Sequence, residues 1–93
     1  MAQGEVSTWQ DDERVRVTGW TFADGESTGP HRHEHDYLVV PITGGTFEVV
    51  DADGSTRTMT QRPGAPYEGK AGTEHDVINR SRQTATFVEV ELK

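Results

Sequence analysis

The sequence has no cysteine among its 93 residues, so the chain can form no disulfide and can offer no thiolate to a metal ion. No apolar stretch approaches the roughly 20 residues that span a bilayer, and the N-terminus lacks the basic flank and apolar run of a signal peptide. Basic residues are also few: 9 Lys and Arg stand against 16 Asp and Glu, for a formal net charge of −7. This balance argues against nucleic-acid or anionic-membrane partners. We therefore expect an acidic, soluble, cytoplasmic domain.

Hydrophobic residues make up only 31% of the chain, which predicts a single small domain with a thin core or with burial shared with a second subunit. Ten glycines and four prolines separate short segments rich in Val, Thr, Ile, Phe and Tyr, and no helical pattern of useful length occurs. This predicts an all-β sandwich or barrel. Strands are expected at residues 14–22, 31–41, 46–50, 56–60, 67–68, 75–79 and 85–92. Residues 1–12 are expected to form a flexible or loosely pinned arm, and residues 13–93 the domain.

All four histidines lie in two places, with His31, His33 and His35 in one short segment and His75 further along. Alternate residues of a strand point to one face, so the first three would project together, with Tyr37 continuing the row. A later strand would bring His75 to them. Neutral imidazoles suit Fe, Ni, Zn, Mn, Co or Cu, and three nitrogen ligands leave positions open for water or substrate. The pattern predicts a divalent transition-metal site whose metal the ligand type does not identify.

Spacing around the first histidines matches a known signature. The segment reads Gly25-x5-His31-x-His33-x3-Tyr37-x6-Gly44. It resembles the first signature of the cupin superfamily, Gly-x5-His-x-His-x3-Glu-x6-Gly. This segment departs from the signature at one position, because Tyr37 stands where the family usually has a metal-binding glutamate.

A second segment reads Gly64-x5-Lys70-x-Gly72-x2-His75-x3-Asn79. It is similar to the second cupin signature, Gly-x5-Pro-x-Gly-x2-His-x3-Asn, with Lys70 in place of the proline. Two spacings that match in the right order within a chain of this size make the resemblance specific. It covers roughly residues 14 to 92.

The resemblance implies a small cupin-type jelly-roll β-barrel that holds a small-molecule ligand or substrate. Carried over residue by residue, it implies that His31, His33 and His75 ligate the metal. It also implies a homodimer, since small cupins commonly pair through sheet edges. The stretch at residues 31–41 looks like that of small bacterial cupins without an assigned chemistry, some of which are labelled β-alanine-degradation proteins.

The fourth position of the metal site stays open. Tyr37 could ligate as a phenolate, donate a hydrogen bond to metal-bound water, or fill the barrel as a core aromatic. His35 could take the position if the strand bends, act as a general acid or base near neutral pH, or lie at the surface. Glu89 and Glu91 are expected to face solvent, with one of them entering the pocket if the inner face of the last strand is the polar one.

These residues favour a metal-dependent enzyme, dioxygenase-like or isomerase-like, that acts on a small organic molecule. Tyr37 and His35 would be its catalytic residues. The first alternative is a non-catalytic module that binds a metabolite or a metal. The second is a metal-free cupin with a structural role.

Overall fold

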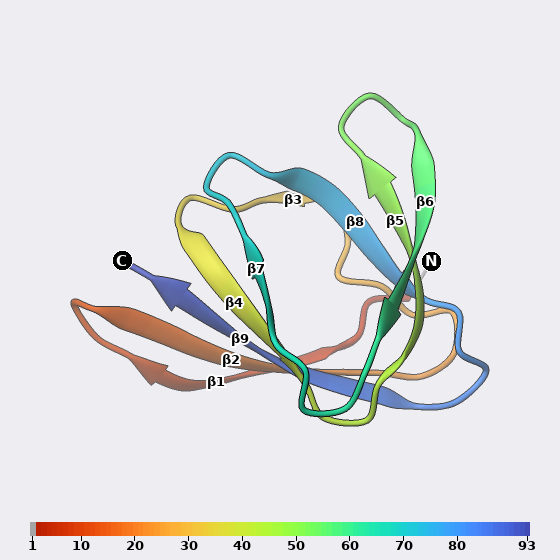
Figure 1. Ribbon diagram of the computed structural model, residues 1–93, viewed down its shortest axis with the longest axis horizontal. Helices are drawn as coiled ribbons and strands as arrows, with labels where there is room; N and C mark the ends of the chain where they lie inside the picture. The colour runs from red at the N-terminus through yellow and green to blue at the C-terminus, as the bar shows by residue number, and fades with distance from the viewer. Residues whose placement is uncertain (1) are drawn as a thin grey trace.

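The computed structural model describes residues 2–93, which form nine β-strands in two facing sheets (Figure 1). In chain order the strands are β1 (Glu5–Asp11), β2 (Val15–Phe22), β3 (His31–Arg32), β4 (Asp36–Pro41), β5 (Gly45–Asp51), β6 (Thr56–Gln61), β7 (Tyr67–Gly69), β8 (Glu74–Asn79) and β9 (Ala85–Leu92). Across residues 2–93 there is no helix long and apolar enough to cross a membrane. The predicted all-β class is confirmed.

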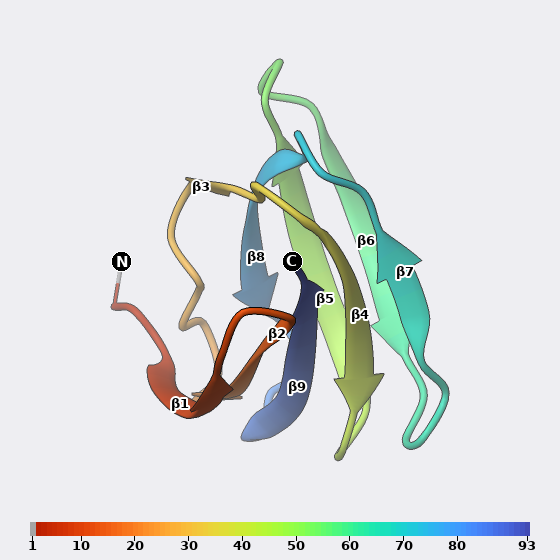
Figure 2. The same cartoon turned by 90° about the vertical axis from the view of Figure 1, so that its left-hand side faces the viewer.

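The two sheets differ in size and face each other. One has the order β1-β2-β9-β4-β7 and the other β3-β8-β5-β6, and the strand pairs within both are antiparallel. Figure 2 shows the edge strands β1 and β3 on one side of the molecule and the edge strands β6 and β7 on the other. The sheets therefore enclose one interior, as in a jelly-roll barrel.

Three phenylalanines form the centre of this interior. Phe22, Phe47 and Phe87 are each at most 2% exposed, and their ring centroids lie 5.4 to 6.1 Å apart. They come from β2, β5 and β9, so the cluster joins the two sheets. Burial of one such side chain contributes about 1.5–3 kcal/mol to folding. The cluster extends toward Tyr37, which is also buried.

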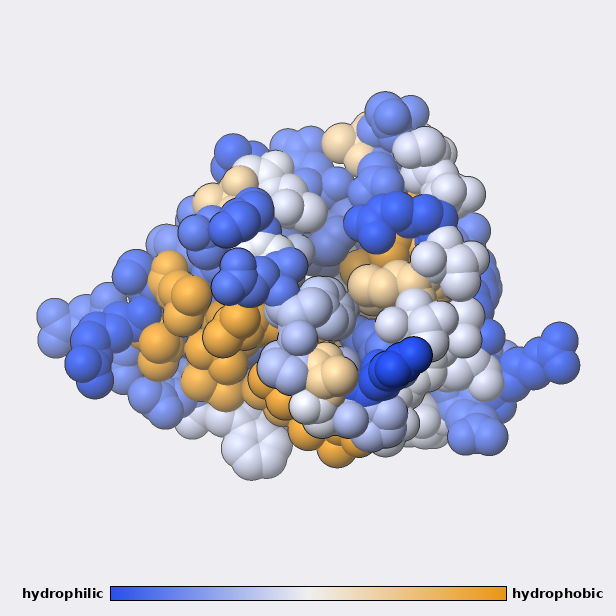
Figure 3. Space-filling model, in the orientation of Figure 1, coloured by the Kyte–Doolittle hydropathy of each residue, from blue (hydrophilic) through white to orange (hydrophobic). Residues whose placement is uncertain are grey.

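The outer face of the five-stranded sheet is aliphatic. Val90 pairs with Val17 on one side and Leu38 on the other, and Val88 pairs with Val40, so these half-buried side chains form rows across β2, β9 and β4. Hydrophobic residues gather in Figure 3 over the area that β4 and β9 occupy in Figure 1. Period-2 alternation thus gives β9 two different faces, with Ala85, Phe87 and Glu89 inward and the valines outward.

The segment expected to be an N-terminal arm contains a regular strand. β1 pairs with β2 in antiparallel register, with a bulge between Thr8 and Gln10, although all seven of its side chains are exposed. Backbone hydrogen bonds rather than burial hold β1, so the hydrophobic pattern gave no signal for it. Trp9 crosses Gly19 of β2 so closely that a Cβ at position 19 would overlap the indole. Met1 lies outside the described residues, and the boundary at residue 13 stays a prediction.

The single strand expected over residues 31–41 is two strands. β3 ends at Arg32, the chain bends at residues 34–35, and β4 begins at Asp36 in the other sheet. This segment therefore crosses from one sheet to the other, and the predicted metal ligands lie where it crosses.

Candidate metal centre

Three of the four histidines meet at one point. His31 of β3 lies directly opposite His75 of β8, so their side chains share one face of the sheet. His33 follows β3 and completes the group. Its Nε2 lies 2.9 Å from Nε2 of His31 and 3.2 Å from Nε2 of His75. The structure thus brings together the three residues that the sequence analysis selected as metal ligands.

A backbone carbonyl orients the ring of His31. Its Nδ1 lies 2.9 Å from the carbonyl oxygen of Gly29. A carbonyl can only accept, so Nδ1 carries a hydrogen, and Nε2 is the ring nitrogen that faces His33. This backbone partner is the kind that orients metal-binding histidines and sets their tautomer.

The spacing of the three nitrogens fits a shared cation. Two nitrogens bound to one metal at about 2.0–2.1 Å lie about 3.0 Å apart in octahedral geometry and about 3.4 Å apart in tetrahedral geometry. The Nε2 separations of 2.9 and 3.2 Å match these edges. The other ring nitrogen of His75, Nδ1, is buried and has no hydrogen-bond partner among the described residues. The donor set therefore fits a divalent transition metal.

Burial keeps two of these rings neutral. It lowers the pKa of His33 to about 4, with further lowering from the charges of His31 and His75. Burial likewise lowers the pKa of His75 to about 4, helped by the charges of His31 and Arg57 and opposed by Asp51. A neutral imidazole has a free lone pair, so both rings are in the form that binds a metal.

Tyr37 lies against the group rather than at the surface. Its ring stacks on His33, with centroids 3.8 Å apart and planes 16° from parallel. The ring also covers Gly69, its cross-strand partner on β7, where any Cβ would overlap the ring. Burial and the nearby Glu89 raise the pKa of Tyr37, partly opposed by the Thr73 hydroxyl. Tyr37 is thus a neutral phenol, and its role as ligand or proton donor stays a prediction.

His35 does not join the other histidines. It is half-buried in the bend at residues 34–35, where strict strand alternation has ended. Within residues 2–93, the group whose ligand atoms lie within 4.8 Å of one another consists of His31, His33 and His75. The bend turns the chain toward β4 without bringing a fourth imidazole to the centre. A catalytic role for His35 stays a prediction.

Glu89 corrects the expectation that the glutamates of the last strand face solvent. It is only 8% exposed, and its Oε1 accepts a 3.1 Å hydrogen bond from Trp20 Nε1. Its Oε2 lies 3.9 Å from His33 Nε2. Burial raises the pKa of Glu89 to about 7, opposed by the hydrogen bond from Trp20 and reinforced by Glu91. The signal in the sequence was its place two residues after Phe87 on the inner face of β9.

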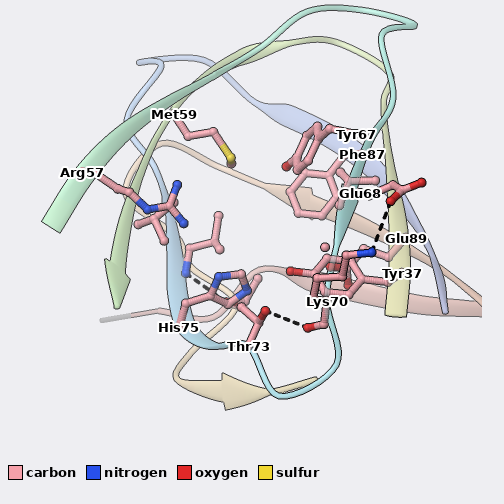
Figure 4. Close-up of a pocket in the computed structure, with 15 residues that line it drawn as sticks. Tyr37, Arg57, Met59, Tyr67, Glu68, Lys70, Thr73, His75, Phe87 and Glu89 are labelled. Atoms are coloured by element: carbon pink, nitrogen blue, oxygen red, sulfur yellow. Dashed lines mark hydrogen bonds and ion pairs between the residues drawn. The ribbon is translucent and has the colours of Figure 1, made fainter. Parts of the chain in front are cut away.

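Two cavities flank the centre. The inner one has a volume of about 330 Å³, and Figure 4 shows the side chains that line it, among them Tyr37, Met59, Tyr67, His75, Phe87 and Glu89. The second is a groove of about 540 Å³, whose lining includes Arg16, Trp20, His31, Arg32, His33 and Glu89. Glu89 lines both. A ligand of small-molecule size can therefore reach His75 from inside the barrel, and His31 and His33 from the groove.

Comparison with known proteins agrees with this geometry. The cupin domain family matches residues 20–91. The chain is 48% identical over 83 residues to the β-alanine degradation protein BauB of Pseudomonas aeruginosa, covering 89% of this chain and 86% of BauB.

Solved structures share the fold. The crystal structure of a cupin domain from Bordetella pertussis superposes with a TM-score of 0.94 at 40% identity, covering 99% of this chain and 95% of that one. The polyketide cyclase RemF of Streptomyces resistomycificus superposes with a TM-score of 0.71 at 22% identity, covering 98% of this chain and 68% of that one, and shows likeness of fold alone. With its matched domain, its two signatures and its barrel, the chain belongs to the cupin family.

Proposed function

We propose that this chain is a metal-dependent enzyme that acts on a small organic molecule bound inside the barrel. The observation that carries the proposal is the convergence of three histidine Nε2 atoms between the two cavities. His75 lines the inner cavity of about 330 Å³, and His31 and His33 line the groove of about 540 Å³. His31, His33 and His75 would hold a divalent transition metal, and no fourth histidine competes for the open positions. When bound, such a metal supplies Lewis-acid or dioxygen chemistry, as in the dioxygenase-like and isomerase-like reactions expected from the sequence.

The lining of the inner cavity suggests the kind of substrate. Apolar side chains form part of its wall. Arg57 and Lys70 add positive charge to it, with Lys70 also paired with Glu68 and Arg57 with Asp51. In Figure 4 the Arg57 guanidinium points toward the cavity. A small molecule with one carboxylate would match both features. The name of BauB associates that relative with β-alanine degradation, and compounds of that kind are small and carry a carboxylate.

The residues around the cavity would have separate roles in proton donation and in the exclusion of water. Tyr37 lines it next to His33 and, as a neutral phenol, can donate a hydrogen bond or a proton to a bound molecule. Phe87, Met59 and Val49 would exclude water from its apolar part. His35, the other residue proposed to be catalytic, would act from the bend that follows the metal ligands.

Turnover by reconstituted protein tests the proposal. The untagged protein would be stripped with a chelator, reloaded separately with Fe²⁺, Ni²⁺, Zn²⁺, Mn²⁺, Co²⁺ or Cu²⁺, and assayed by mass spectrometry against small hydroxy, keto and amino carboxylic acids. We expect turnover with at least one metal and none in the stripped protein. Equal turnover with and without metal, or metal binding with no turnover of any compound, would contradict it.

A second candidate is a non-catalytic cupin that binds a metabolite or a metal. One observation favours it: of the two residues proposed to be catalytic, Tyr37 lines the inner cavity, whereas His35 lies in the bend outside the histidine group. Stabilisation by a small carboxylate in a thermal-shift assay, with no chemical change in that compound, would support this candidate over the enzyme.

We further propose that the chain acts as a homodimer in the cytoplasm. Support for the dimer comes from the outer face of the five-stranded sheet, where Val17, Val88, Val90, Leu38 and Val40 form uncharged rows. Two such faces could pack in the aligned manner of a β-sandwich. The contact proposed here is a sheet face, whereas the family resemblance implies pairing through sheet edges.

A further inference from the structure

We propose that Glu89 supplies the carboxylate of the metal centre, as a fourth ligand through Oε2, and that Trp20 orients it. This inference rests on the proposed metal site. It concerns the position left open by Tyr37, which stands where the family signature has glutamate. A carboxylate lost from β4 would be replaced by one from the neighbouring strand β9.

Strand pairing brings Glu89 to the side of the barrel where His33 lies. β9 lies between β2 and β4, and Glu89 pairs with Thr18 of the first and Val39 of the second. Tyr37 pairs with Glu91. Glu89 comes two residues before Glu91 in β9, so its side chain lies on the same face of the sheet. Its side chain therefore points into the interior, beside the ring of Tyr37 and the histidine that this ring covers.

A hydrogen bond leaves one carboxylate oxygen directed at the histidines. Trp20 Nε1 donates to Oε1 at 3.1 Å, and Oε2 lies 3.9 Å from His33 Nε2. Two ligand atoms on one metal are separated by about 3.0 Å when adjacent and about 4.2 Å when opposite. The 3.9 Å separation falls within this range. Glu89 lies near one of the three histidines and outside the group whose ligand atoms are within 4.8 Å of one another, so ligation requires Oε2 to move toward the three Nε2 atoms.

The lack of a cationic partner for Glu89 also supports metal ligation. A buried carboxylate is costly unless it is paired with a positive charge. Among the described residues, the one basic side chain within 4.0 Å of the Glu89 carboxylate is the neutral His33, whereas Arg16 pairs with Asp11 and Glu91. A divalent cation between Glu89 and the neutral imidazoles would provide the missing positive charge. Glu89 also lines both cavities, so it borders the centre on each side.

Metal binding by glutamine variants tests the inference. Zn²⁺ affinity would be measured by competition with a chromophoric chelator, and Co²⁺-loaded protein would be examined by visible absorption. We expect Glu89→Gln to weaken Zn²⁺ binding by about tenfold or more and to change the Co²⁺ spectrum. Trp20→Phe should weaken binding less. Glu48→Gln, at a glutamate that pairs with Arg80 and lines neither cavity, is the control and should change neither.

The results distinguish failure of the Glu89 inference from failure of the proposed function. Wild-type affinity and an unchanged Co²⁺ spectrum in Glu89→Gln would overturn the inference while leaving the three-histidine site intact. Absence of metal binding by the wild-type protein would overturn the proposed function itself. Glu89→Asp, which keeps the charge on a shorter side chain, guards against a folding artefact. It should bind Zn²⁺ more tightly than Glu89→Gln, and equal weakening in both would count against ligation.

Discussion

His31 and His75 are cross-strand partners in the β3–β8 pair, with ring centroids 4.7 Å apart, although 44 positions separate them in the chain. β3 has only two residues, and its pairing with β8 places one imidazole from each signature side by side. The centre therefore depends on this short pair. The metal site is formed by register between two strands and completed by His33 where the chain leaves β3.

Removal of the paired histidines should abolish metal binding. We expect the double substitution His31→Ala and His75→Ala to reduce bound metal to a small fraction of the wild-type stoichiometry, because one imidazole alone does not hold a divalent ion firmly. Elemental analysis of protein purified without a tag or chelator would measure this. His35→Ala is the matched control and should retain metal, since His35 lies outside the group. Equal metal content in the double variant and the wild type would refute the site.

A side chain at position 69 should destabilise the fold through Tyr37. We expect Gly69→Ala to lower the free energy of unfolding by about 1–3 kcal/mol, because a Cβ there overlaps the tyrosine ring. Urea denaturation followed by tryptophan fluorescence would measure the change. In a Tyr37→Ala background the same substitution should cost much less, since the ring is gone. An equal cost in both backgrounds would show that the contact with Tyr37 is not the cause.

Loss of the Asn79 side chain should weaken the fold without emptying the metal site. Asn79 is fully buried, and its Nδ2 donates to the carbonyl oxygens of Phe22 at 3.2 Å and Gln83 at 2.7 Å. Its Oδ1 accepts from the backbone NH of Ser81 at 3.0 Å. Because Asn79→Ala leaves these groups unpaired, we expect a loss of about 2–3 kcal/mol in unfolding free energy.

The Asn79→Asp variant gives the companion test. Aspartate can still accept from Ser81 but, when ionised, cannot donate to the two carbonyl groups. It should therefore be at least as unstable as Asn79→Ala at neutral pH. Metal stoichiometry of the folded variants should remain that of the wild type, and loss of metal from folded protein would mean that Asn79 does more than secure this turn.

Tyr67 should make the protein less stable at alkaline pH. Burial raises the pKa of Tyr67 to about 12, opposed by the hydrogen bond from Gln61 and reinforced by Glu89 and Tyr37. The fold favours the neutral phenol, so this contribution to stability is complete below the unfolded pKa of about 10 and is lost as pH rises from 10 toward 12. Unfolding free energies at pH 8 and pH 11 should show the loss. The loss should be smaller in Tyr67→Phe, and an equal loss would exclude Tyr67 as its source.

A charge on the outer face of the five-stranded sheet should separate the proposed dimer. Val90 lies in the middle of this face, between Val17 and Leu38. We expect Val90→Glu to convert a dimer into a monomer in light scattering at micromolar concentration. Thr60→Glu, on the exposed edge strand β6, is the control and should leave the dimer intact. A monomeric wild-type protein would refute the proposal.

Some of this protein could be predicted from the sequence because the evidence is local. The all-β class followed from period-2 alternation, from the Gly and Pro residues between short segments, and from the absence of helical periodicity. The strands at 15–22, 56–61 and 85–92 were predicted to within a residue or two. The spacing of His31, His33 and His75 was enough to select the residues that meet. β1 was missed because its side chains are exposed and backbone pairing leaves no hydrophobic signature.

By itself the sequence determined the kind of chain: acidic, free of cysteine, built of short strands, and supplied with imidazoles at the spacing of a cupin. Only the tertiary structure decided which of those groups share a site. The bend at residues 34–35 left His35 out of the group, and the placement of β9 between β2 and β4 brought Glu89 beside His33. The physical reason is that alternation assigns a side chain to one of two faces. Which face is inside, and what meets there, depends on how distant strands pair.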